Sequence, residues 1–153
     1  MVLLKSITKT HHEIMKQNFT LCLFLIAVAV TLFSFTDSDA QTDLKKSMER
    51  GKRIYGSYCQ TCHMQNGLGI EGVFPPLAKS DYLMADRQRS IHQILNGASG
   101  KMVVNGKTYN GNMPPQGLTA KQTADVLNYI MNSWGNKAEI VTVGEVKAAQ
   151  KKK

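Results

Sequence analysis

The spacing of apolar residues predicts a chain made mostly of helices. The first stretch is a stripe of small, apolar and aromatic residues three or four positions apart: Leu44, Met48, Gly51, Tyr55 and Tyr58. This spacing places side chains on one face of an α-helix. Thr42 precedes the stripe and has the side chain expected of a helix N-cap.

A second helix is predicted from about residue 87 to residue 96. Asp86 precedes it as a candidate N-cap, and Gly97 follows it as a candidate C-terminal residue with positive φ. Its apolar side consists of Ile91, Ile94 and Leu95. Further along, residues 103–109 carry Asn-Gly at their centre, which predicts a small β-hairpin.

The last long helix is predicted to begin after Thr119, its N-cap, and to end at Gly135. One face carries Leu127, Ile130, Met131 and Trp134, with Val126 and Tyr129 beside it. A capping box from Thr142 to Glu145 then predicts a short helix in the C-terminal tail. The predicted fold class is therefore all-α: one small helical domain with a minor hairpin.

A separate apolar run, Leu21 to Phe33, carries no charge and is preceded by Lys16. The small-residue segment Ser38-Asp39-Ala40 follows it and has the form of a cleavage site, so residues 1–40 are interpreted as a secretory signal peptide. Translation starting at Met15 would give this signal a shorter positive start. The alternative is an uncleaved membrane anchor, although the run is shorter than the roughly 18–20 apolar residues that a spanning helix needs. We expect a mature domain at 41–136 and a tail at 137–153.

Composition narrows the class of protein further. The chain has 153 residues and three cysteines, which excludes a multidomain enzyme and a small fold held by several disulfides. The formal net charge is +8, and the first forty residues contribute none of it. Residues 41–153 contain one Phe and one Trp, few bulky side chains for an interior of this size. A cofactor that fills part of the core would explain this.

The strongest chemical signal is Cys59-Gln-Thr-Cys62-His63. C-x-x-C-H is the attachment sequence of c-type haem. Two thiols three positions apart at the end of a helix can each form a thioether with one vinyl group of the same porphyrin. The adjacent imidazole of His63 can then bind the iron.

These cysteines have three other interpretations. A zinc site needs a second pair of ligands, and beyond residue 40 the chain has no further cysteine and only one further histidine, His92. A dithiol oxidoreductase is expected in a βαβ context, which the helical pattern does not provide. The third alternative is a plain disulfide. Covalent haem c is the interpretation that the motif favours.

The sixth ligand of the iron separates electron carriers from gas-binding proteins. Met113 lies between Asn112 and Pro114 in a segment predicted to be a stiff, extended loop. Such a loop could hold the thioether over the iron, although Met113 could instead pack on the core. Met84 and Met102 are weaker alternatives. Met48 and Met131 lie on core stripes, Met64 follows His63 too closely to cross the ring, and His92 lies off its helix stripe.

From Leu44 to about Asn136 the chain resembles the class I monohaem c-type cytochromes. Gly51 to Tyr55 is similar to that family's first helix, and Val126 and Tyr129 occupy the matching face of the last helix. Phrases such as Phe74 to Leu83 resemble, less specifically, the cytochrome c domains associated with copper nitrite reductases and periplasmic dehydrogenases.

The resemblance implies roles for particular residues. Pro75-Pro76-Leu77 is similar to the family's P-x-L stretch, which implies that the Pro75 carbonyl accepts a hydrogen bond from His63 Nδ1. Met113 falls at the position of the family's distal methionine. The implied cofactor-binding residues are therefore Cys59, Cys62, His63, Met113 and Pro75, with His63 and Met113 as axial iron ligands.

We expect an exported or periplasmic one-electron carrier that is monomeric and is not an enzyme. Its expected partners are redox proteins, such as a nitrite reductase, a terminal oxidase or a dehydrogenase, that are acidic at the docking site and attract the basic domain. Nucleic acid is not expected as a partner, and a membrane only if the signal stays uncleaved. The alternative function is a haem-based gas sensor with a displaceable sixth ligand. The alternative to electrostatic docking is a basic surface that merely aids solubility.

Overall fold

The computed structural model describes residues 21–22, 24 and 36–151. The chain divides into two compact units, Met1–Gln41 and Thr42–Lys153. The expected signal segment falls for the most part outside the described residues, and its cleavage after residue 40 stays a prediction. In the described part of the chain, no helix is both long and apolar enough to cross a membrane.

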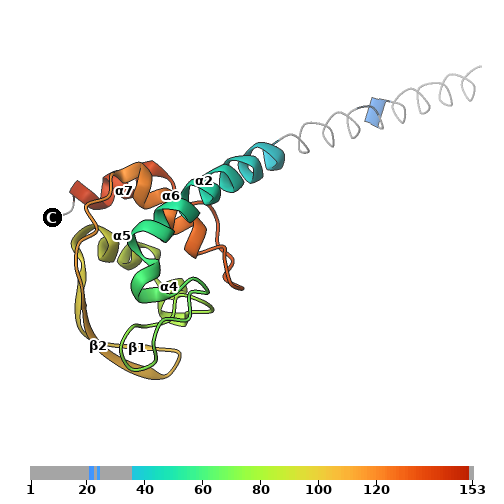
Figure 1. Ribbon diagram of the computed structural model, residues 1–153. Coiled ribbons are helices and arrows are strands. Elements are labelled where there is room, and N and C mark those ends of the chain that lie inside the picture. The colour runs from blue at the N-terminus through green and yellow to red at the C-terminus, as the bar shows by residue number, and fades with distance from the viewer. Residues whose placement is uncertain (1–20, 23, 25–35, 152–153) are drawn as a thin grey trace, which may run out of the picture. The chain divides into compact units, whose positions relative to one another are not determined.

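The second unit is mostly helical, as the sequence predicts (Figure 1). Its helices are α2 (Thr36–Tyr58, which begins in the first unit), α3 (Gln60–His63), α4 (Asp81–Ala85), α5 (Arg87–Asn96), α6 (Ala120–Ile130) and α7 (Val143–Lys151). Between α5 and α6 lies an antiparallel hairpin of β1 (Ala98–Val104) and β2 (Lys107–Met113). The all-α class with a minor hairpin is confirmed.

Helix α6 forms the centre of the core. Every residue from Thr123 to Asn128 is buried, and the capping box of Thr119 and Gln122 satisfies its first turn. Helix α2 packs very closely against it, because Gly51 has no side chain. A Cβ on Gly51 would lie 1.9 Å from the Asp125 carbonyl oxygen.

The tail is an ordered part of the second unit. As predicted, Glu145 and Thr142 form a capping box at the start of α7. Val146 and Ala149 are buried, and α7 contacts both α5 and α6. Arg87 at the start of α5 reinforces this packing, because its guanidinium bonds the Glu145 carboxylate at 3.2 Å.

The hairpin is longer than predicted. Asn105 and Gly106 form its turn, as expected, but the register runs on until Ala98 pairs with Met113. At its tip, Asp81 and Asn105 exchange two hydrogen bonds of 2.7 and 3.0 Å, in which each side chain accepts from the other backbone N–H. The prediction of a loop at Met113 is therefore wrong, because residue 113 ends β2.

Two further details of the first predicted helix are corrected. Thr42 does not cap it, because α2 begins at Thr36, and no Gly or Pro interrupts the chain before Gly51. Tyr58, expected on the buried stripe, is 50% exposed, whereas Tyr55 on the same stripe is buried. Tyr58 lies in the last turn of α2, where the stripe reaches the opening of a cavity.

Helix α6 also ends earlier than predicted. Its last residue is Ile130, and Trp134 has a φ of +54° instead of continuing the apolar face. The backbone shows where the helix ends, since the Asn132 N–H bonds the Tyr129 carbonyl, three residues back, and not the carbonyl four residues back that an α-helix requires.

Candidate functional site

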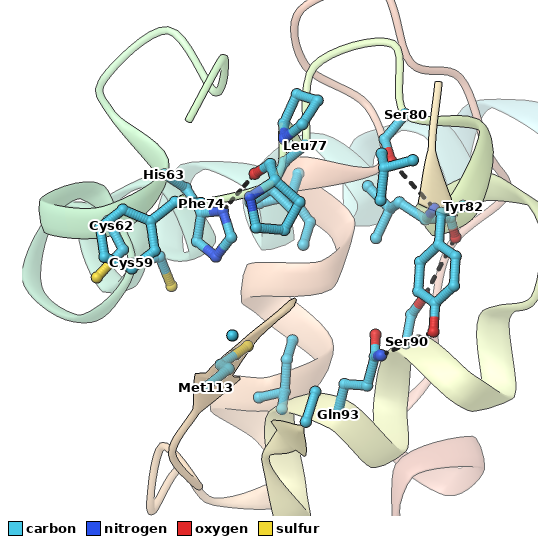
Figure 2. Close-up of a pocket in the computed structure, with 18 of the residues that line it drawn as sticks. Cys59, Cys62, His63, Phe74, Leu77, Ser80, Tyr82, Ser90, Gln93 and Met113 are labelled. Atoms are coloured by element: carbon cyan, nitrogen blue, oxygen red, sulfur yellow. Dashed lines mark hydrogen bonds between the residues drawn. The ribbon is translucent and has the colours of Figure 1, made fainter. Parts of the chain in front are cut away.

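A cavity of about 230 Å³ lies between α3, α5, α6 and the hairpin. One water needs only about 10–15 Å³ by the same measure, so this space suits a much larger molecule. Its walls are predominantly apolar and include Phe74, Leu77, Leu83, Ile94, Val104, Val126, Leu127 and Ile130. Figure 2 shows its chemically reactive residues.

One helical turn brings the C-x-x-C-H residues to this cavity. The Cys59 N–H still bonds the Tyr55 carbonyl at 2.9 Å, and the short helix α3 follows, with the His63 N–H on the Cys59 carbonyl at 2.9 Å. Residues i, i+3 and i+4 share one helix face. Cys59, Cys62 and His63 therefore all line the cavity, as the sequence predicted for a shared ligand.

The two thiols are free, and that of Cys59 is held in its neutral form. Burial, followed by the nearby Cys62, raises the pKa of Cys59 to about 11. Dithiol oxidoreductases need a thiolate at neutral pH, which a lowered pKa provides. The Cys59 environment is the opposite of that, so it disfavours dithiol redox chemistry.

His63 is 9% exposed, and its ring is held by one backbone acceptor. Nδ1 and the Pro75 carbonyl oxygen are 2.9 Å apart (Figure 2). Burial lowers the pKa of His63 and outweighs the bond to Pro75, which raises it. The ring is thus neutral at neutral pH, with the proton on Nδ1, so the Nε2 lone pair is available to a metal.

Met113 reaches the cavity from the end of β2. Its side chain and the His63 ring point into the space between them (Figure 2). Of the methionines in the part of the chain that the structure describes, Met102 is the other that lines the cavity. The remaining candidates do not line it: His92 bonds Asn96 instead, and Met131 is buried in the core, as expected.

A group of polar residues on another wall was missed by the sequence analysis. Tyr82, Ser90 and Gln93 line the cavity from α4 and α5, and Gln93 donates to the Tyr82 hydroxyl at 3.1 Å. The Arg89 guanidinium lies 3.7 Å from the centre of the Tyr82 ring and also donates to the Tyr82 carbonyl. The spacing of Ser90 and Gln93 places them on one face of α5, a signal hidden by the apolar stripe next to them.

These residues fit a large, apolar, iron-containing ring. Two thiols are placed for covalent attachment, an imidazole and a thioether are placed for metal binding, and hydroxyl and amide groups could bind polar substituents of the ring. A zinc site is not supported, because no group of three or more His, Cys, Asp and Glu side chains among the described residues is arranged to hold a metal ion.

Comparison with known proteins agrees with this geometry. The family model described as Cytochrome c matches residues 48–134, which include the C-x-x-C-H turn, the cavity walls and all of α6. The match ends before α7, so the C-terminal helix is an addition to the part that the family model covers.

Several bacterial proteins are similar over much of the chain. Cytochrome c-552 of Thermus thermophilus is 38% identical over 113 residues, 67% of this chain and 86% of the relative. The cytochrome c subunit of a quinone alcohol dehydrogenase from Gluconacetobacter polyoxogenes is 33% identical over 99 residues, 63% of this chain but 21% of the relative. The cytochrome c subunit of gluconate 2-dehydrogenase from Pantoea cypripedii is 31% identical over 127 residues, 79% of this chain and 29% of the relative.

Proposed function

The chain belongs to the cytochrome c family, and from this premise we propose that it is an exported one-electron carrier whose iron has His63 and Met113 as axial ligands. As a family member it binds haem c covalently and serves electron transfer. When bound, the haem would supply an iron that can hold one electron as Fe(II) and give it up as Fe(III). We infer which residues of this chain hold the haem and suit it to that role.

The observation that carries the proposal is the meeting of four side chains at one apolar cavity. Cys59 and Cys62 supply two thiols, His63 an imidazole and Met113 a thioether, and they come from elements 50 residues apart in the chain. A thioether favours Fe(II) and raises the reduction potential relative to two imidazoles. If His63 and Met113 both bound the iron, no position would be left on it for substrate or gas.

The bond between His63 and Pro75 supports this assignment. An acceptor on Nδ1 fixes which nitrogen carries the proton, orients the ring and increases the basicity of Nε2. The distance of 2.9 Å is that of a good hydrogen bond. The role of Pro75 is thus to hold the proximal imidazole.

The opening of the cavity suggests how a redox partner docks. Tyr58 and Val73 line the cavity and are about half exposed, at 50% and 53%, so an apolar surface borders the haem. The exposed cations Lys79 and Lys101 each precede a residue that lines the cavity. We infer that partners are redox proteins with an acidic rim around a small apolar contact, which suits fast release.

Export is supported by the uncharged run from Leu21 to Phe33 and by the bacterial relatives, some of which are subunits of dehydrogenases. We propose that this chain likewise accepts electrons from, or passes them to, a dehydrogenase or reductase in the same compartment. It acts as a carrier and not as the enzyme itself.

Haem retention after denaturation tests the attachment. Haem should stay with the wild-type chain through acid-acetone extraction and denaturing electrophoresis. The double variant Cys59→Ala, Cys62→Ala should lose it, because neither thioether can form. Cys22→Ala, which removes the cysteine of the signal segment, is the matched control and should retain it. Haem extracted freely from the wild type would rule out attachment at these residues.

A further inference from the structure

The Pro75 carbonyl, which accepts from His63, is held in a segment with few free torsions. Pro75 and Pro76 both have fixed φ angles, so the chain from Pro75 to Leu77 is stiff. Gly69 packs against this segment, so closely that a Cβ on Gly69 would be 2.7 Å from the Pro75 carbonyl oxygen. The position of Leu77 therefore limits where the Pro75 carbonyl can point.

Leu77 is held on its amide side by the Gly67 carbonyl. The N–H groups of Leu77 and Ala78 both donate to the Gly67 carbonyl, at 2.7 and 2.9 Å. Gly67 in turn lies flat against the Trp134 ring, where a Cβ would come within 2.5 Å of a ring carbon. Trp134 follows α6, so the end of this helix supports the segment from one side.

Leu77 is fixed on its carbonyl side by Asn136. The Asn136 Nδ2 donates to the carbonyls of Leu77 and Ile130, each at 2.8 Å. Both partners are acceptors, so the nitrogen of the amide must be the atom that faces them. Asn136 is 9% exposed, and its two bonds join the Pro75–Leu77 segment to the last residue of α6.

We propose that Asn136 is a positioning residue for His63: it anchors the Leu77 carbonyl to α6 and thereby fixes the Pro75 carbonyl that orients the imidazole. The chain of contacts runs from α6 through Asn136, Leu77 and Pro75 to Nδ1 of His63. This inference rests on His63 binding the iron, as in the proposed function. Asn136 lies just beyond the segment that the family model matches.

A looser Pro75 carbonyl would weaken the hydrogen bond on Nδ1. The imidazole would then give less electron density through Nε2 and stabilise Fe(III) less. Asn136→Ala should therefore raise the midpoint potential above that of the wild type. The Nδ1 proton of His63, followed by NMR in the ferrous protein, should exchange with water about two- to tenfold faster, the range that corresponds to losing one net hydrogen bond.

Asn132→Ala is the matched control. Asn132 also makes two hydrogen bonds after α6, to the Asn128 carbonyl at 3.1 Å and from the Ala138 N–H at 3.0 Å. None of its hydrogen bonds among the described residues reaches Pro75, Pro76 or Leu77. It should lower stability by a similar amount and leave the potential and the proton exchange at their wild-type values. If Asn136→Ala yields no haem protein, Asn136→Ser, which keeps one short donor, is measured instead and should shift both readouts in the same direction.

The outcomes are distinguishable. A wild-type NMR spectrum without an iron-bound His63 would contradict the proposed function and this inference with it. An iron-bound His63 whose potential and Nδ1 exchange are unchanged by the Asn136 variants, or changed equally by Asn132→Ala, would overturn the positioning role alone.

Discussion

In the proposed function, Met113 is the residue that decides between an electron carrier and a ligand-binding protein. It is held at the end of β2 by pairing with Ala98, and the adjacent Pro114 restricts its backbone. A thioether whose backbone is held by strand pairing and by a following proline can stay on a metal without being displaced easily. The hairpin, and not a stiff loop, provides that support.

We predict that Met113→Ala opens the sixth position of the iron. The variant should bind carbon monoxide readily, have a lower reduction potential and lose the sulfur-to-iron charge-transfer band of the ferric protein. Met102→Ala removes the other methionine that lines the cavity and should keep the band. If the band instead survives in Met113→Ala and vanishes in Met102→Ala, the ligand is Met102.

At the scale of elements, α2 and α6 cross at a close contact with both polar and aromatic parts. Gly51 permits the close approach, and Asp125 on α6 accepts bonds of 2.7 Å from both Ser47 and Arg50 of α2. Tyr55 of α2 packs on Tyr129 of α6 and on Trp134, with ring centres 5.4 and 5.1 Å apart. Two substitutions test this crossing.

The first is Gly51→Ala, which should destabilise the protein by about 1–3 kcal/mol, the range for overpacking a close contact. Gly56→Ala lies in the same helix, but the nearest atom to its new Cβ would be a Gln60 side-chain oxygen at 3.9 Å. There, alanine should stabilise by about 0.5–1 kcal/mol, since glycine is costly inside a helix. Denaturant unfolding of the haem-containing protein measures both, and equal effects would contradict the close crossing.

The second substitution is Asp125→Asn, which tests how the stability of the crossing depends on pH. Burial raises the pKa of Asp125, but bonds from Arg50, Ser47 and Lys121 outweigh it and hold this pKa below its usual value. A carboxyl whose pKa is lowered in the folded state stabilises above the unfolded pKa of about 3.9, and this stability is lost as the pH falls toward the folded pKa. Asp125→Asn should cost about 1–3 kcal/mol at pH 7 and flatten the loss of stability below pH 4.

Thermal unfolding between pH 2 and 7 measures this effect. Asp81→Asn is the control: Asp81 bonds Asn105 at the exposed hairpin tip, far from this crossing in sequence. In Asp81→Asn, stability should fall with decreasing pH as steeply as in the wild type. If stability falls just as steeply in Asp125→Asn, the crossing is not held by the Asp125 carboxylate.

Sequence reasoning predicted the elements whose signals are local. Asp86, Thr119 and Thr142 cap α5, α6 and α7 as expected, because a cap depends on residues a few positions away. It missed α4, which has five residues and depends on contacts with α5 and the hairpin. It also missed that β2 extends to Met113, since Asn110-Gly111-Asn112 has low strand propensity and is paired because the turn at Asn105 sets the register.

For the site, the sequence predicted the residues proposed to carry the chemistry but, apart from Pro75, not those that support them. Cys59, Cys62 and His63 form a motif whose spacing has one strong interpretation, and the bond to Pro75 followed from resemblance. Asn136 and Tyr82 could not be predicted, because their roles depend on which carbonyl or ring the folded chain brings beside them.

At the scale of the whole molecule, the proposed docking of acidic partners depends on charge. The net charge of +8 is carried by residues 41–153, and two ionised haem propionates would reduce it to about +6. Part of this charge is paired: Lys107 bonds Glu71 at 2.5 Å. Lys79 and Lys101 are exposed cations next to residues of the cavity wall.

We predict that raising the ionic strength slows electron transfer to the native partner. Steering charges act over about a Debye length, roughly 8 Å at physiological salt. Stopped-flow rates should fall more after charge reversal at Lys79, Lys101 and Lys107 than after reversal of the three terminal lysines, residues 151–153. A rate that is indifferent to salt, or most sensitive to the terminal lysines, would support a basic surface that serves solubility alone.

In the proposed function, this chain holds haem c between His63 and Met113 and so transfers electrons without binding other ligands. The most direct measurement is the optical spectrum of the purified wild type, oxidised and reduced, with and without carbon monoxide. We predict a low-spin c-type spectrum in both states, a sulfur-to-iron charge-transfer band in the ferric form and no change of the ferrous form on adding carbon monoxide. A high-spin spectrum, or ready binding of carbon monoxide by the ferrous wild type, would contradict this claim and favour a haem-based gas sensor.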